Sequence, residues 1–439
     1  MKKKIFVPAI FLITAVPNIA FAATGKIDTG DTAFILFSAA LVMIMTPGLA
    51  LFYGGMVNGK NVISIMMQSF TIIALISVQW VLFGFSLSFS GDTYHLIGNL
   101  HWAGLNNIGL GPDSTYSSTI PLLAFMVYQL MFAIITPALI TGAFAERMKF
   151  SAFIVFTLLW TTLVYDPLAH WVWGNGGWLK NLGALDFAGG TVVHISSGVS
   201  GLVAALVLGK RKNAKMVPHH MPMVLMGAAL LWFGWFGFNA GSALSVNGIA
   251  VNAFVVTNTA AAAAAIGWVL TEWKVSGKPT LLGAVSGAVA GLVAITPASG
   301  YVTAVSAIVI GVISGIICFI SVNYIKHKFG YDDSLDAFGI HGVGGTWGAL
   351  ATGLFATKAI NPAGANGLFY GNPNQLLIQF LSVAATYIFA GLMSFIILKV
   401  ISIFMELRVT KEEEELGLDI VEHGEEAYNL GFKAIDFNQ

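Results

Sequence analysis

The chain contains few charged residues. Only 10% of its 439 residues are Asp, Glu, Lys or Arg, whereas soluble domains carry about 25%. The hydrophobic share is 56% and the mean hydropathy is +0.80. The formal net charge is zero, which gives no indication of a nucleic acid as partner, and none is expected. These values predict an all-α protein that crosses a membrane many times and has no large soluble domain.

Cysteine and catalytic sequence patterns are also scarce. The only cysteine, Cys318, lies in an apolar run and has no partner in the chain, so we expect it to fill space in the core. The sequence contains no HExxH motif, no nucleophile motif and no Ser-His-Asp or Cys-His candidate. These absences favour a protein that is not an enzyme and that holds no metal ion or other cofactor.

The first 22 residues have the three parts of a secretory signal peptide. "MKKK" is a positive start, "IFVPAIFLITAV" is apolar, and "AFA" supplies a cleavage site before Ala23. A first transmembrane helix is the alternative, but the run is short and contains Pro8 and Pro17. We expect cleavage, a mature N-terminus in the periplasm, and a location in the inner membrane of a Gram-negative cell.

The remainder of the chain is organised in long apolar runs. A membrane-spanning helix needs about 20 apolar residues, and eleven segments qualify. They are 32–57, 62–89, 121–145, 150–170, 188–208, 223–240, 249–271, 281–296, 301–323, 335–356 and 376–405. With the N-terminus outside, eleven spans place the C-terminus in the cytoplasm. We therefore expect a transmembrane domain at 23–407 and a cytoplasmic tail at 408–439.

The positions of lysine and arginine agree with this orientation. Thirteen of these residues fall in the loops expected inside, and only Lys26, Lys180 and Lys358 fall outside. Positive residues are enriched in cytoplasmic loops of membrane proteins. The tail "KEEEELGLDIVEHGEEAYNLGFKAIDFNQ" is acidic and too short to bury a core alone, so it is either solvated or docked on the basic loops.

Two of the expected spans contain a histidine in their first half. Asp186 opens span five and is followed by a glycine-rich run and His194, while Asp336 opens span ten and precedes His341. By our topology these spans run in opposite directions, which is the pattern of two inverted five-helix repeats that share a site near the membrane centre. Span eleven is then an additional helix outside the repeats.

Ionisable residues inside a membrane suggest function. Each histidine either ties two helices together by a hydrogen bond or lines a pore. Two imidazoles do not make a zinc site, which usually needs three protein ligands.

Asp186 is either a cation ligand or a cap for the amides that follow it. Glycine-rich stretches in spans five, eight and ten allow close packing, so the conduit is expected to be narrow.

The outer ends of several spans carry aromatic residues and a hydroxyl. Trp171, Trp173 and Trp178 in "AHWVWGNGGW" fit an aromatic belt at the membrane surface. Phe132 belongs to span three, and Ser242 closes span six. Aromatic faces beside a hydroxyl also suit a small cation that donates hydrogen bonds.

These motifs together resemble the ammonium transporter (Amt) family. The similar segments, in family order, are "TPGLALFYGG", "GAFAERMKFSAF", "AHWVWG", "GALDFAGGTVVHI", "WFGFNAGSA", "GAVSGAVAGLVAITPASGY", "DAFGIHGVGGTWG" and, in the tail, "LGLDIVEHGEEAY". Nearly the whole mature chain is covered. The resemblance implies a homotrimer of eleven-helix subunits, each with its own pore.

The resemblance also assigns roles to individual residues. It places the outer cation site at Trp173, Phe132 and Ser242, aromatics near the pore mouth at Phe132 and Phe238, paired pore histidines at His194 and His341, and a supporting role at Asp186. One position departs from the pattern, because Tyr128 stands where bacterial members usually have the outer gating phenylalanine. The added hydroxyl puts the closure and dryness of the gate in question.

The implied function is transport of ammonium, with ammonia crossing the narrow part. A PII-type signalling protein at the cytoplasmic face is the implied partner. The sequence leaves open whether ammonia moves alone or with a proton. Two other functions stay open: a passive channel for small neutral solutes, and an ammonium sensor, for which a fused signalling domain would be expected.

Overall fold

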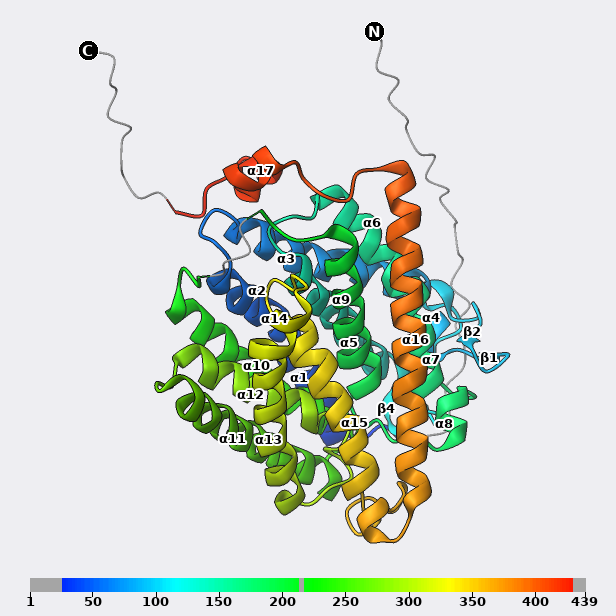
Figure 1. Cartoon of the computed structure of the whole chain (residues 1–439). Helices are drawn as coiled ribbons and strands as arrows, with labels where there is room; N and C mark the ends of the chain where they lie inside the picture. The colour runs from blue at the N-terminus through cyan, green and yellow to red at the C-terminus, as the bar shows by residue number, and fades with distance from the viewer. Residues whose placement is uncertain (1–25, 213–216, 429–439) are drawn as a thin grey trace, which may run out of the picture.

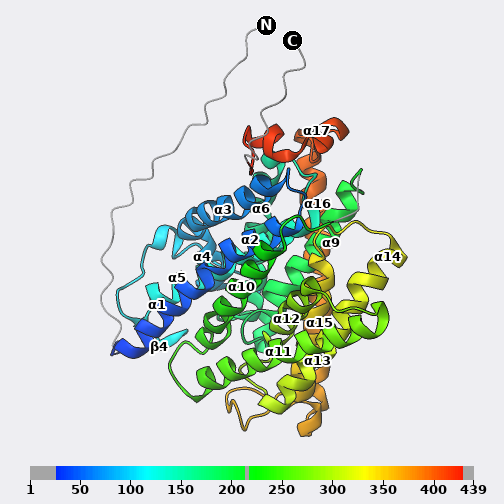
Figure 2. The same cartoon turned by 90° about the vertical axis from the view of Figure 1, so that its left-hand side faces the viewer.

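The computed structural model describes residues 26–212 and 217–428, and almost all of its regular structure is helical. The helices pack side by side into one bundle, and α16 (Pro373–Phe404) runs along one side of it (Figure 1). The segment α1–α2 (Thr29–Met56) forms a tilted rod beside α10 (Met221–Gly241), as Figure 2 shows. The expected signal peptide lies outside the described residues.

Nine helices within the described ranges are long and apolar enough to cross a membrane. They are Thr29–Met56, Val62–Phe89, Leu122–Phe144, Phe150–Val172, Gly190–Leu208, Met221–Gly241, Gly248–Ser276, Ala304–Phe329 and Pro373–Phe404. The other two expected spans are shorter helices, Leu281–Ile295 (α12) and Phe338–Phe355 (η6 and α15). Every expected span is therefore helical. The 15 residues of α12 are fewer than a membrane crossing usually needs, whereas η6 and α15 follow one another directly from Phe338 to Phe355.

Several of these long helices contain a π-helical turn, either within the helix or at its start. In a π turn each backbone hydrogen bond joins residues five apart along the chain, one more than in an α-helix. The elements are α3 (Val62–Gln79), η1 (Trp80–Gly84) and α4 (Phe85–Phe89); α6 (Phe150–Trp160), η3 (Thr161–Tyr165) and α7 (Asp166–Val172); η4 (Gly190–Ile195) and α9 (Ser196–Leu208); α13 (Ala304–Ile320), η5 (Ser321–Ile325) and α14 (Lys326–Phe329); η6 (Phe338–Gly342) and α15 (Val343–Phe355). The uninterrupted helices include α5 (Leu122–Phe144) and α11 (Gly248–Ser276). Because π turns are often found at functional sites, it is relevant that His194 and His341 each lie in one.

The loop from Gly91 to Ile120 contains short strands. Strands β1 (Asp92–Thr93) and β2 (Ile97–Gly98) form one antiparallel pair, and β3 (Pro112–Asp113) and β4 (Ser117–Pro121) form another. Tyr116 of this loop stacks on Phe125 of α5, with ring centroids 4.7 Å apart. The loop is therefore packed against the helices.

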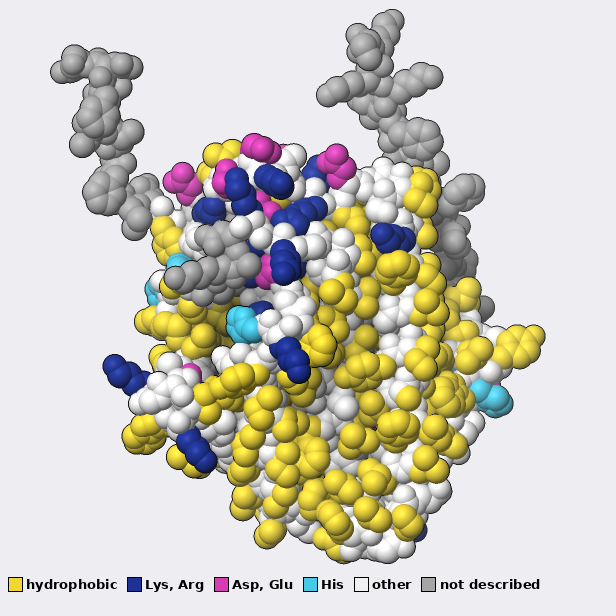
Figure 3. Space-filling view, in the orientation of Figure 1, with side chains coloured by type: hydrophobic (Ala, Val, Ile, Leu, Met, Phe, Trp, Pro, Cys, Tyr) yellow, Lys and Arg dark blue, Asp and Glu magenta, His cyan; other side chains and the backbone are white. Residues whose placement is uncertain are grey.

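On the face shown in Figure 3, most of the charged side chains lie toward one end of the molecule. We call it the basic end, and it comprises the loops 57–61, 145–149 and 209–212 and the segment 405–428. Arg211 binds both Asp332 (2.8 Å) and Glu146 (2.7 Å). Burial favours the neutral acid, but the hydrogen bonds and charge of Arg211 lower the pKa of Asp332 to about 2.

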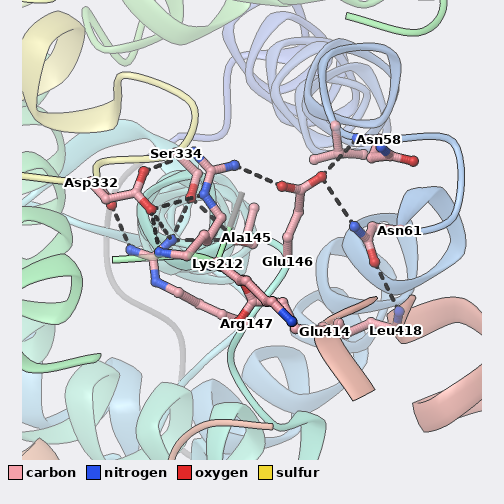
Figure 4. Close-up of polar contacts among 12 residues, drawn as sticks. Asn58, Asn61, Ala145, Glu146, Arg147, Lys212, Asp332, Ser334, Glu414 and Leu418 are labelled. Atoms are coloured by element: carbon pink, nitrogen blue, oxygen red, sulfur yellow. Dashed lines mark hydrogen bonds and ion pairs between the residues drawn. The ribbon is translucent and has the colours of Figure 1, made fainter. Parts of the chain in front are cut away.

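The tail, residues 408–428, packs on the three loops of the basic end. The Leu418 amide donates to Asn61 (2.8 Å), whose side chain in turn donates to Glu146 (Figure 4). Asp419 accepts a hydrogen bond from the Ser64 amide in the first turn of α3. The tail helices are α17 (Lys411–Leu416) and η8 (Asp419–His423). Of the two expectations for the tail, docking on the basic loops is confirmed for residues up to 428.

Candidate functional site

Each membrane histidine is held in a helix whose start is capped by an aspartate. Asp186 accepts hydrogen bonds from the amides of Gly189, Gly190 and Thr191 at 2.6–2.7 Å. Its carboxylate therefore caps the start of η4, and of the two interpretations of Asp186 the geometry supports the cap.

The corresponding cap in the second histidine helix is Asp333, and this corrects the expected match with Asp336. Asp333 accepts from the Ala337 and Phe338 amides at 3.1 and 2.8 Å. It precedes His341 by eight residues, just as Asp186 precedes His194. Asp336 instead has a positive φ of 61° and pairs with Lys326 at 2.6 Å. The equal spacing was present in the sequence and would have identified Asp333.

The two histidine helices touch at glycines. A Cβ on Gly198 of α9 would lie 2.2 Å from the backbone nitrogen of Gly342 in η6. A Cβ on Gly345 would lie 3.0 Å from the Cβ of His194. Since non-bonded carbon atoms approach to about 3.5 Å, the crossing requires a residue without a side chain at position 198 and is tight at position 345. The expectation of close packing around the histidines is confirmed.

This crossing brings His194 and His341 together. Their Nδ1 atoms are 3.3 Å apart, and their rings are nearly parallel, with centroids 5.3 Å apart and an interplanar angle of 22°. Both side chains are buried, with 1% and 4% exposure. An Nδ1–Nδ1 hydrogen bond requires one ring to donate and the other to accept. One Nε2 therefore carries a proton and the other carries a lone pair.

A narrow apolar cavity lies beside the histidine pair. It has a volume of about 10 Å³, which is room for about one water-sized molecule. Apart from the two histidines its walls are apolar, formed by Met45, Leu49, Phe52, Ile135, Leu139, Val193, Leu231, Trp235, Phe238 and Val289. The Nε2 atom of His194 has no hydrogen-bond partner among the described residues. We call this cavity the histidine passage.

Trp235 in this wall was not identified from the sequence. Its ring stacks on His194, with centroids 5.4 Å apart and an angle of 24°, and its Nε1–H donates to Thr296 at 2.8 Å. Trp235 stands three residues before Phe238, so both side chains lie on one helix face. That spacing was the available signal.

A wider hollow of about 410 Å³ lies at one end of the passage. Trp173, Phe132, Ser242 and Asp186 line it together, so the structure brings most of the expected outer-site residues to one place. The Trp173 indole N–H donates to the Asp186 backbone carbonyl at 2.9 Å, which fixes the ring. We call this space the Trp173 hollow.

Two phenyl rings separate the Trp173 hollow from the histidine passage. Phe132 lines the hollow and Phe238 lines the passage. Their ring centroids are only 4.3 Å apart, and Phe132 also meets Trp173 edge-on at 5.9 Å. No opening of solvent size passes between rings in direct contact, so the two phenylalanines close the route in this structure.

Tyr128 lies behind this pair, away from the lining of the Trp173 hollow. Its ring meets Phe132 at 5.0 Å. Its hydroxyl lies 2.8 Å from the Phe238 carbonyl and 3.2 Å from the Ser242 hydroxyl. The extra hydroxyl, compared with phenylalanine, is thus occupied by hydrogen bonds within the protein. It does not add a polar atom to the closed rings.

A second hollow, of about 360 Å³, lies at the other end of the passage. His341, Phe52 and Val289 line both spaces. Lys326, Asp336 and Glu272 make this end polar, so we call it the Lys326 hollow. Because Ser334 on its wall is bonded to Arg147, this hollow lies next to the basic end. Shared lining residues thus connect the Lys326 hollow to the histidine passage. The contact between Phe132 and Phe238 joins the passage to the Trp173 hollow.

Trp171 does not belong to an aromatic belt. It is 8% exposed, its N–H donates to the Leu96 carbonyl at 2.7 Å, and its ring packs on Phe389. Its role is to hold the 91–120 loop against the bundle. Within residues 26–212 and 217–428, no group of three His, Cys, Asp or Glu side chains is placed to hold a metal ion.

Similarity to known proteins extends over nearly the whole chain. A family model described as Ammonium Transporter Family matches residues 33–428. The chain is 59% identical over 400 residues to a protein named ammonium transporter from Bacillus subtilis, covering 91% of this chain and 98% of that protein. It is 49% identical over 422 residues to one of the same name from Aquifex aeolicus, with coverage of 95% and 98%.

Solved structures with the same fold include two kinds of protein. Mep2 from Saccharomyces cerevisiae matches with a TM-score of 0.82 and 38% identity, over 88% of this chain and 91% of that chain. A protein named Sensor Amt Protein matches with a TM-score of 0.83 and 32% identity, over 90% and 98%.

Proposed function

Since the chain belongs to the ammonium transporter family, we propose a mechanism in which it binds ammonium in the Trp173 hollow and conducts ammonia past the histidine pair. Ammonium transport itself is supported by the family match and by the structural neighbours. The protein is a transporter and not an enzyme. The proposed steps are binding of the cation, loss of its proton, and passage of the neutral molecule.

The observation that carries this proposal is the order of the spaces. A hollow with an indole, a phenyl ring and a hydroxyl leads to two closed phenyl rings, then to a dry passage beside two imidazoles, and then to a polar hollow. Moving a bare monovalent ion into such a passage costs tens of kcal/mol by Born estimates. A neutral molecule of the size of water avoids that cost.

Selectivity then depends on the proton. Binding of a cation to aromatic faces contributes about 2 kcal/mol, which is only about 30-fold in affinity. That is too little to exclude potassium, which is similar in size. Potassium has no proton to lose, however, so it cannot enter the passage as a neutral species.

The histidines provide the polar contacts for ammonia in an otherwise apolar wall. One Nε2 donates and the other accepts, and ammonia can do both. The pair also offers a route for the released proton, which would make transport electrogenic. Asp186 supports the site by capping η4 and by holding the Trp173 indole through its backbone carbonyl.

We extend the proposal to the assembly. Eleven helices cross the inner membrane, as two inverted five-helix repeats plus α16, with the mature N-terminus in the periplasm and the tail in the cytoplasm. The matched spacing of Asp186 to His194 and of Asp333 to His341, each ending in a π turn, supports the repeats. The subunits form a homotrimer, and a PII-type signalling protein binds at the basic end.

Proteoliposomes that contain only the purified protein test this function. An inward ammonium gradient should produce a saturable current, methylammonium should produce a smaller one, and potassium should produce none. Uptake without charge movement would favour a passive channel for neutral solutes. An absence of any uptake would favour a sensor, the role that the name of one structural neighbour gives to that protein.

A further inference from the structure

A lysine occupies part of the hollow that we assign to a cation. Lys180, on the short helix α8 (Trp178–Leu182), lines the Trp173 hollow. Its ammonium group donates to the Trp173 carbonyl at 3.0 Å and lies 5.9 Å from the centroid of the Tyr116 ring. A primary ammonium therefore already sits there, held by an aromatic face and an oxygen acceptor.

Both partners of this ammonium are fixed by the surrounding structure. The Tyr116 hydroxyl donates to the Phe89 carbonyl and accepts from the Asn175 amide, and the ring stacks on Phe125. Trp173 is held through its indole N–H by the Asp186 carbonyl. The ring and the carbonyl thus form a preorganised contact for an ammonium group.

No carboxylate neutralises Lys180 among the described residues. It takes part in no ion pair with an Asp or Glu of the described ranges. Asp186, the acidic residue that lines the same hollow, has both carboxylate oxygens engaged by the amides of η4. The ammonium group of Lys180 therefore lies in the hollow without a direct ion-pair partner among the described residues, and its charge acts on any cation that enters.

We propose that the Trp173 carbonyl and the Tyr116 ring form an alkylammonium subsite beside the ammonium site, and that Lys180 fills this subsite as a tethered cation. Its charge opposes the arrival of the transported cation. Lys180 thereby sets the half-saturation concentration for ammonium and makes it depend on ionic strength. This inference rests on the proposed function, because it assumes that the Trp173 hollow is the cation entrance.

The proposal predicts a particular direction of change. Two unit charges 4 Å apart in water repel by about 1 kcal/mol, which corresponds to about fivefold in a binding constant. Lys180→Met removes the charge but retains a long side chain, so the half-saturation concentration should fall by about fivefold or more at low salt. A purely structural tie to Trp173 predicts the opposite, because a loosened Trp173 would bind the cation less well.

Ammonium currents should be measured in proteoliposomes at low and high ionic strength. Lys180→Arg keeps the charge and should behave like the wild type. Lys358→Met is the matched control, because Lys358 is exposed and does not line the hollow. A wild-type current with an unchanged or raised half-saturation concentration in Lys180→Met would overturn the subsite alone. No ammonium current in the wild type would instead overturn the proposed function.

A binding measurement tests the subsite without transport. In Lys180→Ala, n-propylammonium replaces the atoms removed from the lysine side chain. Calorimetry on the detergent-purified protein should show that this variant binds n-propylammonium at least about tenfold more tightly than the wild type does. Lys180→Met serves as the second variant and should not gain this binding, because its side chain still fills the space. Equal affinity in the wild type and Lys180→Ala would refute the subsite.

Discussion

His194 and His341 present different chemistry to the passage, because the hydrogen bond between their Nδ1 atoms makes one ring the donor and the other the acceptor. Trp235 stacks on His194, and a Cβ at Gly345 would press against it. The ring of His194 is thus restrained on more than one side. Rings held this way keep their Nε2 atoms directed along a fixed path, which favours orderly passage of a small polar molecule.

Trp173 is the residue on which cation binding should depend most. Trp173→Leu removes the aromatic face, and loss of a cation–π contact of about 2 kcal/mol should raise the half-saturation concentration about 30-fold. The measurement is the ammonium current at graded concentrations. Leu179→Met, a buried apolar change on the neighbouring helix α8, is the control. Unchanged affinity in Trp173→Leu, with potassium still excluded, would contradict the assignment of the outer site.

The Tyr128 hydroxyl should matter for stability and little for selectivity. Tyr128→Phe removes hydrogen bonds to the Phe238 carbonyl and the Ser242 hydroxyl, at a cost of about 1 kcal/mol. We expect a lower Tm in detergent, an ammonium current within about twofold of the wild type, and no potassium current. A leak of potassium in Tyr128→Phe would mean that the hydroxyl is part of the closed gate.

Individual residues show how far the sequence carries the interpretation. The histidine pair and the Trp173, Phe132 and Ser242 set follow from local motifs, and the structure gathers them as expected. Asp333 was missed because the nearer Asp336 looked like the helix start. Only backbone geometry reveals that Asp336 has left-handed φ and pairs with Lys326 instead. Side-chain orientation at Tyr128 likewise depends on packing that no local pattern encodes.

The histidine helices work as a pair of elements joined at a tight crossing. Each begins at an aspartate cap, continues through a π turn that contains the histidine, and becomes an ordinary α-helix. The extra residue of a π turn displaces the side chains that follow it, and no hydrophobic periodicity reports that displacement. The helices were therefore predictable here, and the resemblance implied that the two histidines pair, whereas the orientation of their rings was not predictable.

A substitution at Gly198 tests whether the two histidine helices must cross this closely. Gly198→Ala places a methyl group 2.2 Å from the Gly342 nitrogen, and overpacking of this kind costs about 1–3 kcal/mol. We expect a lower Tm and a loss of most ammonium current, because the histidine rings are pushed apart. Gly248→Ala is the matched control, since a Cβ there meets nothing within 4 Å. Similar behaviour of the two variants would show that the crossing tolerates separation.

At the scale of the whole molecule, the tail is tied to the loops from which the bundle helices start. Asp419 caps the first turn of α3, and Arg211 joins Glu146 to Asp332 shortly before η6. Because the folded pKa of Asp332 is lowered to about 2 from a reference value of 3.8, its ion pair contributes stability above about pH 4. That stability is lost progressively as the pH falls from about 4 to about 2, so the pair is intact at neutral pH.

Docking of the tail predicts that its removal affects activity. Deletion of all residues after Arg408 leaves the α3 amides and Asn61 without the partners that Asp419 and Leu418 supply. We expect the truncated protein to insert in the membrane and to transport ammonium at a severalfold lower rate. Asp419→Ala, which removes a helix cap worth about 1 kcal/mol, should give an intermediate loss.

Two observations would refute this role of the tail. Glu412→Gln is the control for a charge change alone, because Glu412 is exposed. If this variant loses as much transport rate as Asp419→Ala does, the charge of the tail and not its docking affects transport. Full transport by the truncated protein, measured per molecule inserted, would show that docking has no effect on the pathway.

The central claim is that only a neutral molecule crosses the apolar passage, in which the two histidines act as one hydrogen-bonded unit, and a double-mutant cycle tests it most directly. Ammonium and potassium currents should be recorded for His194→Asp, His341→Glu and the double variant, with His170→Asn, a buried histidine outside the passage, as the control. We predict potassium current in each single variant, strong non-additivity in the double variant, and none in His170→Asn. Additive losses of ammonium current, with potassium excluded by all variants, would contradict the account.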